Sequence, residues 1–391
     1  MNERVTATDQ VPTQRFDAER LERAVASINA ALERAPTTAA ETQIDEAFHA
    51  AWRLAAAAGL LTGHLPEDRG GHGWTVSEAV RAQELLGLRC VDAGFVFAVN
   101  VAAFSHASTL AECASADQRD RYLGPLSRGE RVMGYAITEP DAGSDALALT
   151  SRAQAEGANY RLSGEKIYVT LGGRADFALV FASTAPERGA WGLSAFLVDL
   201  DLPGVSVTAM TKAGLDSVPM ARLRFDEVRL PADVLVGKPG AGRGIFDASQ
   251  LWERSFVLAA QIGTMQRQLD AVIEHARNRE QFGARIGSFQ AVSHRIVDMR
   301  LRLENARLLQ YEAARRKDAG ESLRELSALV KLQVSEAFTA NSLDAVRVFG
   351  GAAYVDEALA VADLRDSLAG LLIAGTNDVQ KNIVASLMGL K

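Results

Sequence analysis

Cysteine, proline and excess positive charge are all scarce in this chain of 391 residues. The two cysteines, Cys90 and Cys113, have no Cys-x-x-Cys spacing, so we expect core thiols in a reducing compartment and neither a disulfide framework nor a cysteine-ligated metal. The 42 basic residues are outnumbered by 49 acidic ones, which gives a formal net charge of −7. Because excess positive charge dominates binding to a phosphate backbone, the composition argues against nucleic acid as a partner.

Long apolar runs are missing as well. The sequence shows no run of about 18 uncharged apolar residues, the length that spans a bilayer, and even Ala50–Leu61 is broken by Arg53. The first residues, Met1–Arg4, are polar and lack the apolar stretch and the cleavage site of a secretory signal. We therefore expect a cytoplasmic protein with no membrane-inserted segment.

What is present is the composition of an ordinary globular protein, with 48% apolar residues and only ten prolines to interrupt helices. The hydrophobic spacing is helical over residues 1–130, strand-like over residues 131–240 and helical again over residues 241–391. We predict an α+β fold made of an N-terminal helical domain, a middle antiparallel β-barrel or sandwich domain, and a C-terminal four-helix bundle.

Signals for several other kinds of chemistry are weak or absent. The glycine-rich run Gly240–Gly244 follows a proline-containing loop and lies in no strand–helix–strand unit, so we reject a Rossmann dinucleotide site. The six histidines show no metal-ligand spacing, and no Gly-x-Ser-x-Gly elbow occurs. We predict neither a metal site nor a serine nucleophile.

The segment Tyr135–Asp145 runs from strand-like residues into a loop rich in hydroxyls and carboxylates. Backbone N–H groups near Gly143 and Ser144 suit a phosphate or the pyrimidine edge of a flavin, because glycine lets the chain approach closely and serine adds a donor. An ordinary turn with an Asx or serine cap fits the same residues. Taken alone, the loop favours the ordinary turn.

Other segments add to this loop. In Gly164–Thr170, Tyr168 and Thr170 are two residues apart and are expected on one face of a strand. The remaining segments are Arg279–Gly283, Phe289–Gln290, Arg347–Gly351, Leu364–Asp366 and Ile373–Gln380. In this order and spacing, on a helical, β, helical chain, they resemble the acyl-CoA dehydrogenase family along nearly the whole length.

The resemblance implies FAD bound between the β domain and the C-terminal helices, in a homotetramer or homodimer whose neighbouring subunit completes the site. It implies that Arg279 and Phe282 reach the dinucleotide of the partner subunit, and that the adenosine side differs here, because Arg347 and Ala353 replace the family's frequent glutamine and glycine. The residues implied to line the flavin are Tyr135, Ile137, Thr138, Ser144, Tyr168 and Thr170. Further FAD contacts are implied at Arg347, Gly350, Gly351 and Thr376.

The catalytic base departs from the family's common pattern. The glutamate that usually precedes Gly-Thr is Ala374 here, which cannot take a proton. Family members without it can carry the carboxylate on an earlier helix, and Leu251–Arg254 resembles that arrangement, which points to Glu253. Apolar neighbours are expected to raise the pKa of Glu253, although a solvated glutamate in an ion pair fits the sequence too. The backbone N–H of Ala374 is expected to polarise the thioester carbonyl.

Three functions stay open. The segments Trp252–Arg254, Gln290–Ile296 and Leu301–Leu309 look like a branch that oxidises small acyl or aminoacyl thioesters on an acyl or peptidyl carrier protein, in secondary-metabolite biosynthesis. A catabolic short- or branched-chain acyl-CoA dehydrogenase is the first alternative, and a flavin-binding hydroxylase or a non-dehydrogenating flavoprotein of the same fold is the second. An electron-transferring flavoprotein or oxygen is the family's usual acceptor. For an acidic carrier protein, Arg315–Lys317 is a candidate basic patch.

Overall fold

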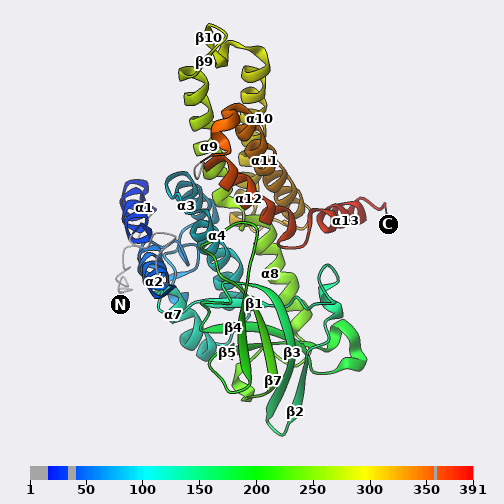
Figure 1. Cartoon of the computed structure of the whole chain (residues 1–391). Helices are drawn as coiled ribbons and strands as arrows, with labels where there is room; N and C mark the ends of the chain where they lie inside the picture. The colour runs from blue at the N-terminus through cyan, green and yellow to red at the C-terminus, as the bar shows by residue number, and fades with distance from the viewer. Residues whose placement is uncertain (1–15, 34–40, 356–358, 391) are drawn as a thin grey trace, which may run out of the picture.

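The computed structural model describes residues 16–33, 41–355 and 359–390, and it has helices at both ends of the chain around a central β domain (Figure 1). The N-terminal helices are α1 (Ala18–Leu32), α2 (Glu41–Ala57), α3 (Val76–Arg89), α4 (Ala93–Val101), α5 (Ser108–Cys113), α6 (Ala116–Gln118) and α7 (Gly124–Ser127). Helix α3 begins with a capping box, in which Thr75 and Glu78 each accept the other's backbone N–H through their side chains. The predicted N-terminal helices are present.

A continuous helix, Ala93–Cys113, runs through the middle of the N-terminal region and consists of α4, a π-helical segment (Ala102–Ala107) and α5. It is long and apolar enough to cross a membrane, but 94% of its most apolar window is buried inside the protein, as in the core helix of a globular fold. Asn100, Ser105 and His106 interrupt the run, so it does not stand out in the sequence as a continuous apolar stretch.

The middle region is a single eight-stranded sheet with the strand order β6-β7-β3-β2-β4-β5-β8, and β1 pairs with β4. Its strands are β1 (Met133–Ala136), β2 (Arg152–Glu156), β3 (Asn159–Thr170), β4 (Phe177–Ser183), β5 (Leu193–Asp199), β6 (Val205–Met210), β7 (Met220–Leu230) and β8 (Leu235–Val236). Most pairs are antiparallel as predicted, but β1 and β2 both pair with β4 in parallel. Strand β3 lies in the sequence between β4 and both of these strands, so the intervening chain is long enough for parallel pairing, which a tight turn cannot make.

The C-terminal region returns to helices. They are α8 (Gly242–Phe256), α9 (Ala259–Asn278), α10 (Gln290–Asp318), α11 (Leu326–Phe349), α12 (Leu359–Leu372) and α13 (Asn377–Leu387). Between α9 and α10 the short strands β9 (Glu280–Gln281) and β10 (Ala284–Arg285) form a hairpin. In Figure 1 this hairpin lies at the top of the molecule, at the end away from the sheet. The predicted helical C-terminal region and the α+β class are confirmed.

Two apolar cores hold these elements together, and α8 belongs to both. One core combines residues of the N-terminal helices with Trp252, Phe256 and the later C-terminal helices. The other fills the β domain and includes Ile245 near the start of α8. Because helices from both ends of the chain share one core, the division at residues 130 and 240 stays a prediction. Helix α8 lies where the two cores meet.

Candidate active site

Glu253 is a half-buried carboxylate on α8. Its Oε2 atom accepts a hydrogen bond from Nε2 of Gln250 at 2.8 Å, and the hydroxyl of Ser105 lies 3.5 Å from the same oxygen. Burial raises the pKa of Glu253 to about 7, although Arg254 and these two donors favour the charged form. A carboxylate with this pKa is partly ionised at neutral pH and can accept a proton there.

Two different helices supply the donors to Glu253. Gln250 is three residues earlier on α8, a spacing that puts both side chains on one face of the helix. Ser105 belongs to the π-helical segment, which carries an extra residue in its turn and so changes the direction of the side chains that follow. Among the residues that the structure describes, no hydrogen bond engages Oε1 of Glu253. That oxygen is the one available to a substrate.

Tyr135 is brought to the same face of α8. Its hydroxyl lies 2.6 Å from that of Ser249, one helical turn before Glu253. Burial raises the pKa of Tyr135 well above its usual range, and the nearby Glu253 carboxylate adds to this rise. The structure therefore joins two predicted residues, one from β1 and one from α8, that are far apart in the sequence.

The connector between α12 and α13, residues 373–376, lies against α8. Ala374 and Gly375 have positive φ angles of 54° and 79°. The carbonyl of Ala374 accepts from Nε of Arg254 at 3.3 Å and from Nε2 of Gln380 at 2.9 Å. Arg254 follows Glu253 directly, so the backbone at Ala374 lies close to the carboxylate. Within the described chain, the N–H of Ala374 has no hydrogen-bond partner.

Thr376 ends this connector as the N-cap of α13. Its hydroxyl accepts from the backbone N–H of Val379 at 3.4 Å. The predicted Gly-Thr pair therefore starts a helix of 11 residues. The capping preference of threonine accounts for the residue at this position.

The predicted flavin residues of the β domain lie around the end of β1 and a bulge in β3. The carbonyl of Ile137 accepts from Nζ of Lys166 at 3.1 Å, and that of Thr138 accepts from the N–H of Ile167 at 2.9 Å. Tyr168 has φ 56°, and the register between β3 and β7 shifts beside it. The bulge lies between Lys166 and Val169, and the exposed Tyr168 and the half-buried Thr170 flank the buried Val169. The shared face of Tyr168 and Thr170 stays a prediction.

The bulge leaves Tyr168 as an exposed aromatic ring, 58% accessible. Ser144 is exposed as well, in the loop after β1. A Cβ placed at Gly143 would meet no atom within 4 Å. The loop and the bulge therefore offer an open aromatic and polar surface that the protein's own side chains do not fill.

A buried ion pair supports this surface, and the sequence analysis missed it. Nζ of Lys166, with no exposed side chain, lies 2.8 Å from Oε1 of Glu139. The Glu139 carboxylate also accepts from the backbone and hydroxyl groups of Thr150 and Ser151. Burial opposes ionisation of Glu139, but Lys166 and these donors outweigh it and lower its pKa to about 2. The bonds of Glu139 to Thr150 and Ser151 join the two ends of the loop that contains Ser144.

A second group of predicted residues lies at the other end of the C-terminal helices. Phe282 is 97% exposed, in the hairpin after α9, beside Arg279. The ring of Phe349, at the end of α11, lies 4.7 Å from that of His275 near the same hairpin. The residues Arg347, Gly350 and Gly351 adjoin Phe349. Helix α9 has 20 residues and is about 30 Å long, so the chain does not bring this group to Glu253.

The run Arg315–Lys317, the candidate basic patch, is paired with acidic side chains. Arg315 and Arg316 form ion pairs with Glu312 and Glu321. Nζ of Lys317 lies 4.1 Å from the centre of the Trp252 ring and 3.8 Å from Glu112. Glu312 lies one turn earlier on α10, Glu321 lies in the following loop and Glu112 belongs to α5. These pairings cannot be recognised from the charges of the run alone.

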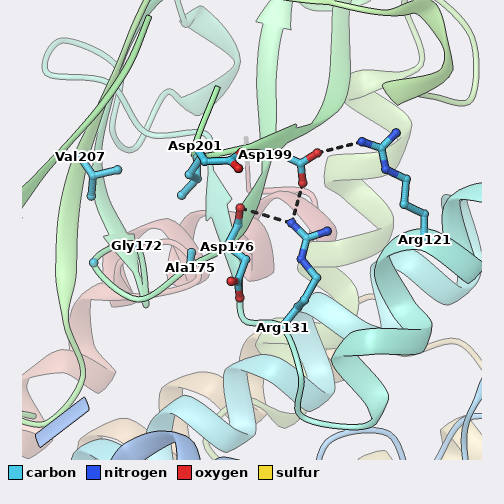
Figure 2. Close-up of a pocket in the computed structure, with 10 residues that line it drawn as sticks. Arg121, Arg131, Gly172, Ala175, Asp176, Asp199, Asp201 and Val207 are labelled. Atoms are coloured by element: carbon cyan, nitrogen blue, oxygen red, sulfur yellow. Dashed lines mark hydrogen bonds and ion pairs between the residues drawn. The ribbon is translucent and has the colours of Figure 1, made fainter. Parts of the chain in front are cut away.

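A hollow of about 600 Å³ lies elsewhere, lined by the turn between β3 and β4, the end of β5, one residue of β6, and Arg121 and Arg131, which precede the sheet in the sequence (Figure 2). Arg131 bonds to Asp199 at 2.5 Å, and Arg121 bonds to the same carboxylate at 2.9 Å. None of the predicted site residues lines this hollow. In the described part of the chain, no group of three or more metal-ligating side chains is found. The region around Glu253 is therefore the candidate site.

Known proteins match the whole arrangement. The N-terminal, middle and C-terminal domains of acyl-CoA dehydrogenases match residues 18–130, 134–228 and 240–389. An L-prolyl-[peptidyl-carrier protein] dehydrogenase of Pseudomonas fluorescens is 42% identical over 85% of this chain and 88% of its own length. The mitochondrial short-chain specific acyl-CoA dehydrogenase of Homo sapiens is 33% identical over 84% of this chain and 79% of its own.

Solved structures agree. The prolyl acyl carrier protein oxidase AnaB superposes with a TM-score of 0.88 at 31% identity, covering 95% of this chain and 98% of that one. The FAD complex of PigA also has a TM-score of 0.88, at 32% identity over 98% of this chain and all of its own. The chain belongs to the acyl-CoA dehydrogenase family, whose members are FAD-dependent oxidoreductases acting on CH–CH groups.

Proposed function

We propose that this enzyme introduces a Cα–Cβ double bond into a small acyl or aminoacyl thioester tethered to an acyl or peptidyl carrier protein, in secondary-metabolite biosynthesis. The observation that carries the proposal is the Glu253 carboxylate, whose pKa of about 7 suits a general base. The identity of 42% to a prolyl-carrier-protein dehydrogenase supports the carrier-bound substrate, with a prolyl group as the first candidate.

The residues present fit FAD. Positions Gly143, Gly350 and Gly351 have open space where a Cβ would be, and Tyr168 offers an exposed ring. We assign the flavin to the surface formed by Tyr135, Ile137, Thr138, Ser144, Tyr168 and Thr170, with a further contact at Thr376. When bound, FAD accepts the hydride that leaves the β-carbon of the substrate.

Glu253 supplies the other half of the reaction. Oε1 takes the α-proton, while Gln250 and Ser105 hold Oε2. The backbone N–H of Ala374 donates to the thioester carbonyl and stabilises the negative charge that develops there as the α-proton leaves. Tyr135, bonded to Ser249, fixes the face of α8 that carries the base.

Assembly is part of the proposal. Phe282 and Arg279 lie too far from Glu253 to act on the same flavin within one chain, and Phe282 is almost fully exposed. We infer a homodimer or homotetramer in which these residues, with Arg347, Gly350 and Gly351, contact the FAD of a partner subunit. We place the enzyme in the cytoplasm, where an electron-transferring flavoprotein or oxygen takes up the electrons.

A second candidate is a catabolic short- or branched-chain acyl-CoA dehydrogenase, which the 33% identity to the human short-chain enzyme favours. A panel of aminoacyl- and acyl-loaded carrier proteins and the matching free CoA thioesters separates the two. Flavin bleaching and mass spectrometry of the product are followed in parallel. We expect bleaching and loss of two mass units with loaded carrier only. Rapid bleaching by CoA thioesters alone would favour the second candidate.

A further inference from the structure

We propose that Lys331 is a positioning residue of this active site, which fixes the connector that contains Ala374 by binding the residues at both of its ends. The inference rests on the proposed function, since it concerns how Glu253 and Ala374 are held for their roles there. Lys331 is on α11 and touches neither residue directly, so it acts through the groups that it binds.

The contacts of Lys331 bracket the connector. Lys331 is 0% exposed, and its Nζ donates to the carbonyl of Leu371 at 3.2 Å and to Oδ1 of Asn377 at 2.5 Å. Leu371 lies near the end of α12 and Asn377 is the first residue of α13. In the described chain, no carboxylate lies within ion-pair distance of Nζ. A buried ammonium with only neutral partners is costly, so its presence calls for a reason.

The carbonyl oxygens within the connector also accept hydrogen bonds from nearby side chains. Arg254 and Gln380 donate to the carbonyl of Ala374, and Gln380 also donates to that of Gly375. In a trans peptide the carbonyl and the next N–H point in opposite directions. The N–H groups of Gly375 and Thr376 are therefore directed away from Arg254 and Gln380.

The backbone conformation shows why such bracing is needed. Ala374 has a left-handed φ of 54°, which an L-residue adopts only when its surroundings enforce it. Asn377 completes the support, because its amide donates to Ser335 at 3.1 Å and to Glu336 at 2.8 Å on α11. Lys331 and Asn377 thus tie both ends of the strained connector to one rigid helix.

The charge of Lys331 also acts on the base. Lys331 and Glu253 act on each other electrostatically. The other ionisable groups around them are Arg254 and Asp247 on α8, Glu336 on α11 and Tyr135 on β1. Burial lowers the pKa of Lys331 to about 8, so the ammonium is mostly charged at neutral pH. Its positive charge, with that of Arg254, favours the ionised form of Glu253.

The test uses the FAD-loaded enzyme and three variants: Lys331→Met, Lys331→Arg and, as a control, Lys381→Met. Lys381 is an exposed lysine on α13 that pairs with Asp378. Three quantities are measured: the rate of flavin bleaching by loaded carrier against pH, the infrared titration of the Glu253 carboxyl identified with Glu253→Gln, and hydrogen exchange of the amides at residues 373–376.

We expect Lys331→Met to keep its FAD but to bleach about 100-fold more slowly at neutral pH, as misplacement of a reacting group does. Its Glu253 titration should move to higher pH, because a positive charge is lost, and the connector amides should exchange faster. Lys331→Arg should keep the titration near that of the wild type, and Lys381→Met should match the wild type throughout. A Lys331→Met enzyme with unchanged titration and exchange would overturn the proposal.

If Lys331→Met fails to fold, the Asn377→Ala variant tests the proposal instead. This variant keeps the charge of Lys331 but removes one of the two groups that anchor the connector to it. Faster exchange at residues 373–376 with an unshifted Glu253 titration supports the proposal, and unchanged exchange refutes it. The titration and the exchange need no substrate. A wild-type enzyme whose flavin is bleached by none of the thioesters tested would instead refute the proposed function.

Discussion

The side-chain amide of Gln250 donates to Oε2 of Glu253 across 2.8 Å, from the preceding turn of the same helix. This bond stabilises the charged carboxylate and opposes the effect of burial, which is the larger of the two and raises the pKa to about 7. It also occupies one oxygen and leaves the other for the substrate. The orientation and the proton affinity of the base thus depend in part on a neutral neighbour, alongside Arg254 and Ser105.

Replacing Glu253 with glutamine removes the base and nearly preserves the shape of the side chain. We expect the rate of flavin bleaching by a loaded carrier to fall by about 10²–10⁴, the usual contribution of a general base, with FAD content unchanged. Stopped-flow absorbance measures the rate. The matched control is Glu274→Gln, an exposed position on α9, which should bleach at the wild-type rate. Retention of full activity by Glu253→Gln would exclude this residue as the base.

The pH dependence follows from the sign of the pKa shift. Glu253 acts as a base only when ionised, so the bleaching rate should rise with pH and level off above its pKa of about 7. Gln250→Leu removes a donor to the ionised form, so the apparent pKa should rise by about one unit and the rate at neutral pH should fall several-fold. Gln154→Leu, an exposed position on β2, is the control. A downward shift in Gln250→Leu would contradict this account.

The ion pair of Lys166 and Glu139 should matter for stability. Lys166→Met leaves a carboxylate buried without its counter-charge, which costs about 3–5 kcal/mol. We expect a lower thermal midpoint and weaker retention of FAD, measured by calorimetry and by flavin absorbance after dialysis. Glu130→Ala breaks the solvent-exposed pair with Arg128 and should leave the midpoint unchanged. Equal effects of the two variants would show that burial of the first pair is unimportant.

The exposed ring of Phe282 provides a test of assembly. We expect Phe282→Ser to dissociate the oligomer in part and to lose FAD on dilution, because both depend on a contact between subunits in our proposal. Light scattering after gel filtration gives the mass, and flavin absorbance gives the occupancy. Val207→Ser, an exposed apolar position on β6, should change neither. A fully assembled and FAD-saturated Phe282→Ser enzyme would remove Phe282 from the proposed contact.

The sequence was sufficient for the order of helical and β regions, because the periods of 3.6 and 2 residues are local properties of the chain. Local patterns also pointed to Glu253, through the resemblance of Leu251–Arg254 to a helix that carries the base, and this role stays a prediction. Its contact with Ser105 and the approach of Tyr135 to Ser249 could not be predicted, since each joins residues more than 100 positions apart.

Local irregularities were harder still to predict. The bulge at Tyr168 and the π-helical segment at Ala102–Ala107 each add a single residue to an otherwise regular element, and such a short shift of the hydrophobic pattern cannot be recognised in one sequence. Lys166 is a charged residue in a strand, which normally faces water, and only its distant partner Glu139 explains its burial. Arg315 and Arg316 likewise pair with Glu312, which lies outside the run Arg315–Lys317.

The π-helical turn has a consequence for the gene. Loss of one codon within residues 102–107 would restore a regular α-helix and rotate every later side chain of that helix by about 100° relative to those before it. Ser105 and the apolar residues of α5 could then no longer all face their present neighbours. We therefore expect residues 102–107 to tolerate substitutions but not insertions or deletions.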